Sequence, residues 1–296
     1  MGNMDGVHLG HRAIIALVKN LALPQGLLTH VVSFDPHPRD YFAALGRGAP
    51  VQHIQSVRDR IEQLAGLGVD ALHLLRFNTA LATLSPENFV TQILVAACRA
   101  RHVVVGKDVR FGHQRAGDLE RLIQLGAQHG FAVHTLDDVV DSHARISSST
   151  LRHALAAGDM PSAARLLGRS YSISGRVIHG RKLGRALGCP TMNLIPRIPN
   201  PALRGICVVR IHGVDSASLL GVASLGLRPT VEQTTRFSLE VHAFDWRGDA
   251  YGKRVHVEFL HKLRDEAAYV DLPTLQIAIE KDMRDALAWI DGNALA

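Results

Sequence analysis

The chain has 296 residues, enough for about two domains of ordinary size. Hydrophobic residues make up 47% and charged residues 20% of the sequence, so a disordered or fibrous protein is excluded. The formal net charge is +6, but Lys and Arg are scattered singly, and we do not predict nucleic acid as a partner. No apolar run reaches the ~18 residues of a membrane span, and residues 1–5 lack the pattern of a signal peptide. We expect a cytoplasmic protein with no membrane partner, and its oligomeric state stays open.

The first half of the chain alternates short apolar strands with helices. Strands are predicted over residues 26–34, 71–77, 102–106 and 131–136. Helices are predicted over residues 13–21, 56–67 and 118–130, and from Pro86 onward with Ser85 as its N-cap. Strands that alternate with helices in this way indicate a Rossmann-like α/β domain with a parallel sheet.

The second half changes character after two helices, predicted over residues 149–157 and 162–167. Short β-rich segments follow at residues 171–178, 205–212, 219–225, 237–244 and 254–260, and a helix closes the chain at 275–289. Turn signals between the segments predict an antiparallel β-barrel. We therefore predict two domains, residues 1–168 and 169–296. The three cysteines, Cys98, Cys189 and Cys207, show no spacing typical of zinc or of a disulfide framework.

The first chemical signal is the segment at residues 2–11, which reads GNMDGVHLGH. His8 and His11 are three residues apart, with Gly10 between them, where a helix begins. The N–H groups and the positive dipole of a helix N-terminus favour an anion, and phosphoryl or nucleotidyl transfer needs donors aimed at phosphate oxygens. Taken alone, the pair is equally compatible with two packed histidines or a metal site.

A second signal lies at residues 145–152, which read RISSSTLR. Hydroxyl groups at a helix N-terminus, followed by an arginine, offer several hydrogen bonds to a triphosphate. Alone, this segment is more typical of a capped helix with a surface arginine. Together with the histidine motif at the opposite end of the same α/β domain, it favours a nucleotide site.

These residues resemble the HxGH nucleotidyltransferases, and more closely the adenylyltransferase module of bacterial bifunctional riboflavin kinase/FMN adenylyltransferases. That module has a GNFDGVHxGH opening, a Pro-His-Pro loop, a VGxDFxFG segment and an SSTxIR segment. The counterparts occur in the same order at residues 2–11, 36–38, 105–112 and 147–152. The resemblance implies transfer of AMP from ATP to FMN, which gives FAD and pyrophosphate.

The resemblance also implies roles for individual residues. His8 and His11 would be catalytic, because they would bind ATP phosphates and the transition state, and Asp108 stands where the family contacts its reacting substrates. The further nucleotide- or phosphate-binding residues implied in this half are Asn3, Gly10, Arg145, Ser148, Ser149 and Arg152.

The chain departs from the adenylyltransferase pattern in two ways. Met4 and Val109 stand where the family has Phe, and Ser149 where it has Thr. Family members also have a strand before the motif, in the middle of the parallel sheet, whereas this chain begins at the motif. Loss of a central strand would expose neighbouring strand edges. It would also lower the free energy of unfolding, typically ~5–15 kcal/mol, by several kcal/mol. Two explanations stay open: the true start lies upstream, or this module is impaired.

The densest signal lies at residues 175–194, which read GRVIHGRKLGRALGCPTMNL. Glycines interleaved with basic residues suit a loop over phosphates, because Gly lets backbone N–H groups approach oxygens closely. Thr191 and Asn193 alternate, so on an extended segment their side chains project to the same face. Hydroxyl and amide oxygens are hard ligands suited to Mg²⁺. On spacing alone, an ordinary Gly-rich turn into a strand is favoured.

This half resembles the riboflavin kinase family, whose motifs are GRxLGFPTAN, GVY, GxRPT, a Glu on an internal strand, YGK and LRxE. The counterparts lie at residues 184–193, 205–207, 226–230, 240, 251–253 and 263–266. The resemblance implies transfer of the γ-phosphate of ATP to riboflavin, with Mg²⁺ held at Thr191 and Asn193. Glu240 would be the general base for the terminal ribityl hydroxyl. The phosphate- or nucleotide-binding residues implied here are Gly180, Gly184 and Arg185.

Three functional hypotheses remain. The leading one is a bifunctional flavin-cofactor enzyme that acts on riboflavin, FMN and ATP. The second keeps the kinase but has an inactive N-terminal domain, because of the missing strand. The third is a flavin- or RNA-binding regulator without turnover, which the basic pI allows but which would not need the histidine pair or Glu240. Three departures from the kinase pattern leave the affinity for substrates open. Met192 stands where the family has Ala, Cys189 where it has Phe and Cys207 where it has Tyr.

Overall fold

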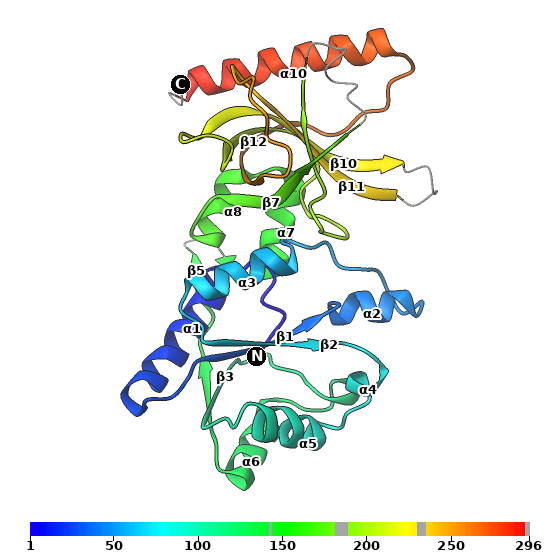
Figure 1. Cartoon of the computed structure of the whole chain (residues 1–296). Helices are drawn as coiled ribbons and strands as arrows, with labels where there is room; N and C mark the ends of the chain where they lie inside the picture. The colour runs from blue at the N-terminus through cyan, green and yellow to red at the C-terminus, as the bar shows by residue number, and fades with distance from the viewer. Residues whose placement is uncertain (142–143, 181–188, 230–234, 294–296) are drawn as a thin grey trace. The chain divides into compact units, whose positions relative to one another are not determined.

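The computed structural model describes residues 1–141, 144–180, 189–229 and 235–293 (Figure 1). The chain divides into two compact units: residues 1–51 with 60–147, and residues 52–59 with 148–296. None of the described helices is long and apolar enough to cross a membrane.

The N-terminal unit contains two pairs of parallel strands. β1 (His30–Asp35) pairs with β2 (Ala71–Arg76), and β3 (His102–Gly106) pairs with β4 (Ala132–Leu136). The predicted parallel pairing is confirmed. The prediction that the first strand starts at residue 26 is wrong, because Gly26, with φ of 62°, ends a short 3₁₀ helix, η1 (Leu23–Gln25).

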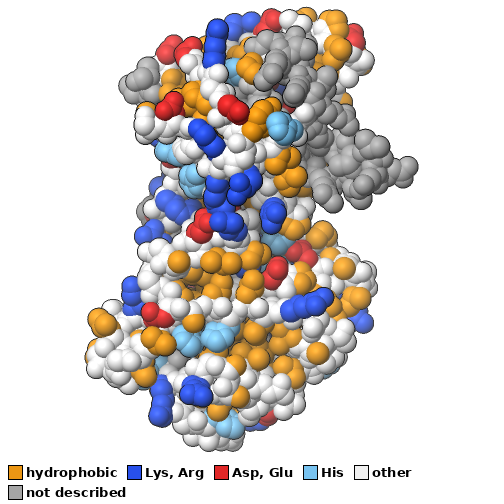
Figure 2. Space-filling model, in the orientation of Figure 1, with side chains coloured by type: hydrophobic (Ala, Val, Ile, Leu, Met, Phe, Trp, Pro, Cys, Tyr) orange, Lys and Arg blue, Asp and Glu red, His pale blue; other side chains and the backbone are white. Residues whose placement is uncertain are grey.

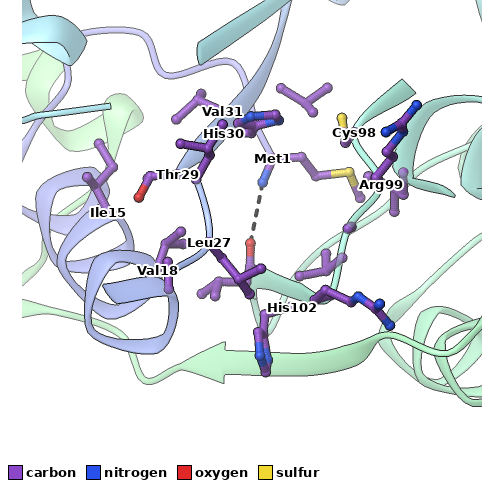
Figure 3. Close-up of a pocket in the computed structure, with 18 of the residues that line it drawn as sticks. Met1, Ile15, Val18, Leu27, Thr29, His30, Val31, Cys98, Arg99 and His102 are labelled. Atoms are coloured by element: carbon purple, nitrogen blue, oxygen red, sulfur yellow. Dashed lines mark hydrogen bonds between the residues drawn. The ribbon is translucent and has the colours of Figure 1, made fainter. Parts of the chain in front are cut away.

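The first residues of the chain hydrogen-bond to both β1 and β3. The Gly2 N–H donates to the Val32 carbonyl at 3.0 Å, and the Met1 amino group donates to the Val104 carbonyl at 3.3 Å. Among the described strands, β1 pairs with β2 alone and β3 with β4 alone. A pocket of ≈ 360 Å³ opens here, with mostly hydrophobic walls (Figure 3).

Most helices of this unit follow the predicted pattern, with local extensions. α1 begins at Leu9, earlier than predicted, because His8 acts as its N-cap and accepts from the His11 N–H. Ser85 caps the helix at Pro86 as predicted, but after one turn the chain continues as a π-helix. The helices are α1 (Leu9–Ala22), α2 (Pro38–Ala44), α3 (Val57–Gly66), α4 (Thr79–Ala82), α5 (Pro86–Phe89), η2 (Val90–Ala97), η3 (His113–Arg115) and α6 (Leu119–His129).

Two hydrophobic clusters form the core of the N-terminal unit. The larger one lies between β3, α6 and the α5–η2 segment, and it includes Val105, Leu122 and Phe131. The smaller one includes Met4, which is 2% exposed and packs with Val7, Ile15, Val31 and Leu64. The methionine that departs from the family pattern thus fills a core position. A short antiparallel pair, β5 (Val140–Asp141) and β6 (Ala144–Arg145), ends the unit.

The second unit is built around a closed barrel, as predicted. Its strands follow the order β10-β11-β8-β7-β12-β9, and every pair is antiparallel. The strands are β7 (Tyr171–Ile178), β8 (Met192–Leu194), β9 (Gly205–His212), β10 (Leu219–Pro229), β11 (Thr235–Ala243) and β12 (Arg254–Arg264). The barrel follows α7 (Ser148–Ala157) and α8 (Met160–Leu167).

The closing helix packs against the outside of the barrel. α10 (Leu272–Gly292) begins at the N-cap Asp271, whose side chain accepts from the Thr274 N–H. Ala286 and Ile290 on this helix are buried together with Val208 of β9 and Val222 of β10. The predicted closing helix is confirmed and is longer than expected.

Candidate active sites

His8 and His11 lie face to face at the start of α1. Their ring centroids are 3.7 Å apart with an interplanar angle of 21°. The His8 Nδ1 accepts from the His11 N–H at 3.4 Å, so the first ring also caps the helix. The predicted pair is therefore brought together where unpaired backbone N–H groups favour an anion.

Gly10 is required by the packing of this motif. A Cβ at residue 10 would lie 3.1 Å from His8 Cε1, 3.2 Å from His8 Nδ1 and 3.4 Å from the Ile146 carbonyl oxygen. These contacts are tighter than ordinary van der Waals contacts, so a side chain here would displace the first histidine. The glycine thus allows the two rings to stack.

The backbone of Asn3 is held by a buried arginine. The Arg60 Nη1 donates to the Asn3 carbonyl at 2.7 Å and to the Ser33 hydroxyl at 3.0 Å. The Asn3 side-chain oxygen is buried, and no described residue hydrogen-bonds to it. A buried polar atom without a partner is uncommon in proteins, so this atom is suited to a ligand. Sequence reasoning missed Arg60, because its partners are 57 and 27 residues away.

Asp108 and Arg145 are joined by an ion pair. The Arg145 Nη2 lies 2.9 Å from Asp108 Oδ2, and its Nε lies 3.0 Å from Asp138 Oδ1. Both predicted residues are well exposed, so the pair is weak and open to competition by a phosphate. Asp138, which holds the other side of the guanidinium, was not predicted.

The remaining predicted residues of the first motif set lie on α7 of the second unit. Ser148 is the first residue of this helix, and Ser149 is exposed. The Arg152 Nε donates to the Gln52 carbonyl at 2.7 Å. Their predicted contacts with a triphosphate stay a prediction.

Two kinase motif residues lie side by side on neighbouring strands of the barrel. β8 pairs with β11 so that Asn193 is directly opposite Glu240, and side chains of directly opposed residues point to the same face. The Asn193 side-chain amide lies 3.5 Å from the Thr191 hydroxyl. A Cβ at Gly180 would overlap the Asn193 side chain, so this glycine gives the amide its room. Gly184 and Arg185 lie outside the described residues.

A second pocket adjoins these residues. It has a volume of ≈ 510 Å³ and is bordered by Thr191 and Met192 of the motif and by the turn that carries Trp246 and Asp249. At its edge, the ring of Tyr251 lies 3.9 Å from the ring of His179, measured between centroids. The aromatic contact was not predicted from the sequence.

The three departures from the kinase pattern are all buried. Met192 is 7% exposed, and Cys189 and Cys207 are 5% and 0% exposed. Burial, with the nearby charges of Asp282 and Glu240, raises the pKa of Cys189 to about 11. Burial raises the pKa of Cys207 to about 12. Both thiols therefore stay protonated at neutral pH and act as core side chains.

Arg264, in the last kinase motif, is engaged by the closing helix. Its Nε and Nη2 donate to the two carboxylate oxygens of Asp282 at 2.7 and 2.6 Å. Asp282 is buried, and its spacing in the sequence gave no sign of this pairing.

Comparison with known protein families also divides the chain into two parts. The family model described as FAD synthetase matches residues 1–150, and the model described as riboflavin kinase matches residues 167–290. The class is thus a nucleotidyltransferase-like unit joined to a kinase barrel.

Curated relatives match nearly the whole chain. A bifunctional riboflavin kinase/FMN adenylyltransferase of Pseudomonas fluorescens is 40% identical over 97% of this chain and 91% of the relative. A protein of the same name from Haemophilus influenzae is 36% identical, over 98% and 93%. A solved structure described as a macrolide-efflux protein from Streptococcus pneumoniae has a TM-score of 0.77 and 28% identity, and the match covers 98% of this chain and 93% of that one. The chain belongs to the bifunctional riboflavin kinase/FMN adenylyltransferase family.

Proposed function

We propose that this chain converts riboflavin into FMN in its barrel and FMN into FAD in its N-terminal half, with ATP as co-substrate of both reactions. Membership of the family supports both activities over an impaired N-terminal half or a regulator without turnover. We assign residues 1–168 to the adenylyltransferase half and residues 169–296 to the kinase half.

In the kinase reaction, the terminal ribityl hydroxyl of riboflavin attacks the γ-phosphorus of ATP. A new oxygen–phosphorus bond forms, the bond between the γ-phosphorus and the bridging oxygen breaks, and ADP leaves. Glu240 accepts the hydroxyl proton, and general base catalysis of this kind typically contributes ~10²–10⁴-fold. The Glu240 position opposite Asn193 is the observation that carries this assignment.

Thr191 and Asn193 fit a magnesium ion. Their hydroxyl and amide groups lie side by side, 3.5 Å apart, and hard oxygen donors of this kind suit Mg²⁺ when phosphates and water complete the site. In the structure, the nitrogen of the Asn193 side chain faces the Thr191 hydroxyl. Rotation of this amide by a half-turn would present its oxygen to the ion instead. When bound, Mg²⁺ supplies neutralisation of charge on the ATP phosphates.

In the adenylyltransferase reaction, a phosphate oxygen of FMN attacks the α-phosphorus of ATP. The bond to the bridging oxygen of the β-phosphate breaks, and pyrophosphate leaves. His8, His11 and the backbone at Gly10 stabilise the charge that develops on the phosphate oxygens. Asn3, Asp108 and Arg145 position the nucleotide, and Ser148, Ser149 and Arg152 hold its triphosphate.

The test is a time course with purified protein, riboflavin, ATP and Mg²⁺, in which the flavins are separated by chromatography. We expect FMN to appear first and FAD to follow. Glu240→Gln should stop FMN formation, whereas FMN supplied directly should still yield FAD. Glu258→Gln, which changes another glutamate of the barrel, is the matched control and should keep FMN formation. If wild type makes neither product and Glu240→Gln behaves identically, the enzyme assignment fails.

A further inference from the structure

Two histidines and a cysteine converge beside the pocket of the N-terminal unit. One donor atom each from His30, His73 and Cys98 lies within 4.8 Å of the other two. His30 is on β1, His73 is on β2, and Cys98 ends η2. His30 and Cys98 line the pocket, where Figure 3 shows them along the same wall with the Met1 side chain beside them.

The two histidines are placed by the parallel ladder. His30 is opposite Ala71, and His73 is opposite Val32, so the imidazoles are diagonal neighbours on one face of the strand pair. The His73 Nε2 and the His30 Nδ1 are 3.1 Å apart. Two nitrogen ligands of a tetrahedral zinc ion, at ~2.0–2.1 Å from the metal, are about 3.3 Å apart. The observed separation is close to this value.

The cysteine is held by a fixed turn at the end of η2. The Cys98 N–H donates to the Ile93 carbonyl at 2.9 Å, and the Arg99 N–H donates to the Val95 carbonyl at 3.1 Å. Arg99 has φ of 49°, the left-handed conformation that ends a helix. Cys98 is a free thiol and half-buried. Its donor atom lies within 4.8 Å of those of the two histidines, and a small side-chain movement would bring the sulfur to the ~2.3 Å of a zinc–sulfur bond.

We propose that His30, His73 and Cys98 bind one zinc ion, with a water molecule in the fourth position. Imidazole and thiolate are the ligands that zinc prefers, whereas magnesium prefers the oxygen donors found at Thr191 and Asn193. The site is independent of both proposed reactions. It would join β1, β2 and the end of η2, and so stabilise the N-terminal unit.

The protonation states agree with this geometry. Burial and the neighbouring His73 lower the pKa of His30, although Asp70 opposes them, so its imidazole is neutral and available to a metal at neutral pH. Burial raises the pKa of the Cys98 thiol, so the metal must displace a proton when it binds. All three groups are partly exposed, and Figure 2 shows histidines among hydrophobic side chains on the surface of this unit.

The same unit contains a matched control. His102 of β3 and His134 of β4 form a second diagonal pair, with the His102 Nδ1 and the His134 Nε2 3.1 Å apart. Within the described part of the chain, no cysteine or carboxylate joins this pair in a comparable group. The second pair thus lacks a thiol ligand, and its His102 is hydrogen-bonded to the Gln25 side chain instead.

The test is titration of the full chain with Co²⁺, followed by displacement with Zn²⁺, under reducing conditions. We expect one ion per chain, a sulfur-to-cobalt charge-transfer band and the visible bands of a tetrahedral site. Cys98→Ser should abolish the charge-transfer band, and His73→Asn should weaken binding about tenfold or more. His134→Asn should change neither, and Cys189 and Cys207 are too deeply buried to supply the thiolate.

Thermal unfolding gives a second measurement. Zn²⁺ should raise the unfolding temperature of the wild type and of His134→Asn, but not that of Cys98→Ser with His73→Asn. The proposal is overturned if the wild type binds no more metal than this double variant, or if the charge-transfer band survives in Cys98→Ser. Neither result depends on kinase or adenylyltransferase activity.

Discussion

At the scale of single residues, buried Arg60 holds the start of the histidine motif through the Asn3 carbonyl. His8 and His11 were predicted because they flank Gly10 where a helix begins, and Glu240 was predicted because its segment resembles the riboflavin kinase family. Arg60 could not be predicted, since its contacts with Asn3 and Ser33 exist only once the chain is folded. Local spacing indicates which groups are candidates for chemistry, whereas long-range contacts decide how firmly they are held.

Gly10→Ala should disturb the packing of the two histidine rings without lowering the stability of the protein. Alanine is favoured over glycine within a helix by ~0.5–1 kcal/mol, so stability should not fall. The new Cβ would lie 3.1 Å from His8 Cε1 and move this ring by a few tenths of an ångström. A displacement of ~1 Å can cost on the order of 10²-fold in rate, so we expect about a tenfold loss of FAD formation from FMN and ATP.

Two controls accompany this variant. FMN formation from riboflavin by the same sample should be unchanged. Gly66→Ala, at a helical glycine with nothing near its would-be Cβ, should change neither rate. An unchanged rate of FAD formation in Gly10→Ala would show that the stacked pair is not used in the adenylyl transfer.

At the scale of elements, hydrophobic periodicity predicted the strands and long helices, and it failed where hydrogen bonds decide the boundary. α1 starts early because a histidine caps it, and β1 starts late because Gly26 ends a preceding turn. The convergence of His30, His73 and Cys98 was also invisible, since each residue stands on a different element. Pairing between elements, not spacing along the chain, brings these groups together.

Glu258 links β12 to β9 and makes barrel stability depend on pH. It is opposite Arg210 in the ladder, and its Oε2 lies 3.1 Å from His212 Nε2. Burial raises the pKa of Glu258, but hydrogen bonds from Ser170 and His212 and the charge of Arg210 outweigh burial and lower it below 4.5. A lowered carboxyl pKa contributes stability above the unfolded-state pKa, and this is lost as the pH falls through the folded-state pKa.

Glu258→Gln should therefore destabilise the barrel by about 1 kcal/mol near neutral pH. The difference from wild type should shrink as the pH falls through the lowered folded-state pKa of Glu258, because the wild-type carboxyl is then protonated. Urea unfolding followed by tryptophan fluorescence checks this, because Trp246 and Trp289 are the two tryptophans of the chain and both belong to the second unit. A difference that stays constant from neutral to acid pH would mean that packing, not charge, is lost.

At the scale of the whole molecule, the change from alternating helices and strands to short β-rich segments predicted two kinds of architecture, and both are found. Motif order then indicated which reaction belongs to each half. The sequence could not indicate whether FMN made in the barrel is released before it is adenylylated. That question concerns how a product moves between two sites, and no residue pattern in the sequence indicates it.

Mixing two single-site variants answers this question. Glu240→Gln should lack kinase activity but convert supplied FMN into FAD, and His11→Asn should make FMN but no FAD. Because His11 and Glu240 belong to separate compact units, we expect each variant to retain its other activity. The mixture should then convert riboflavin into FAD after a lag, through FMN free in solution. A different result would be a mixture that forms FMN but no FAD, although each variant keeps its single activity and this FMN reaches concentrations at which supplied FMN reacts. FMN would then have to pass from one site to the other within one chain.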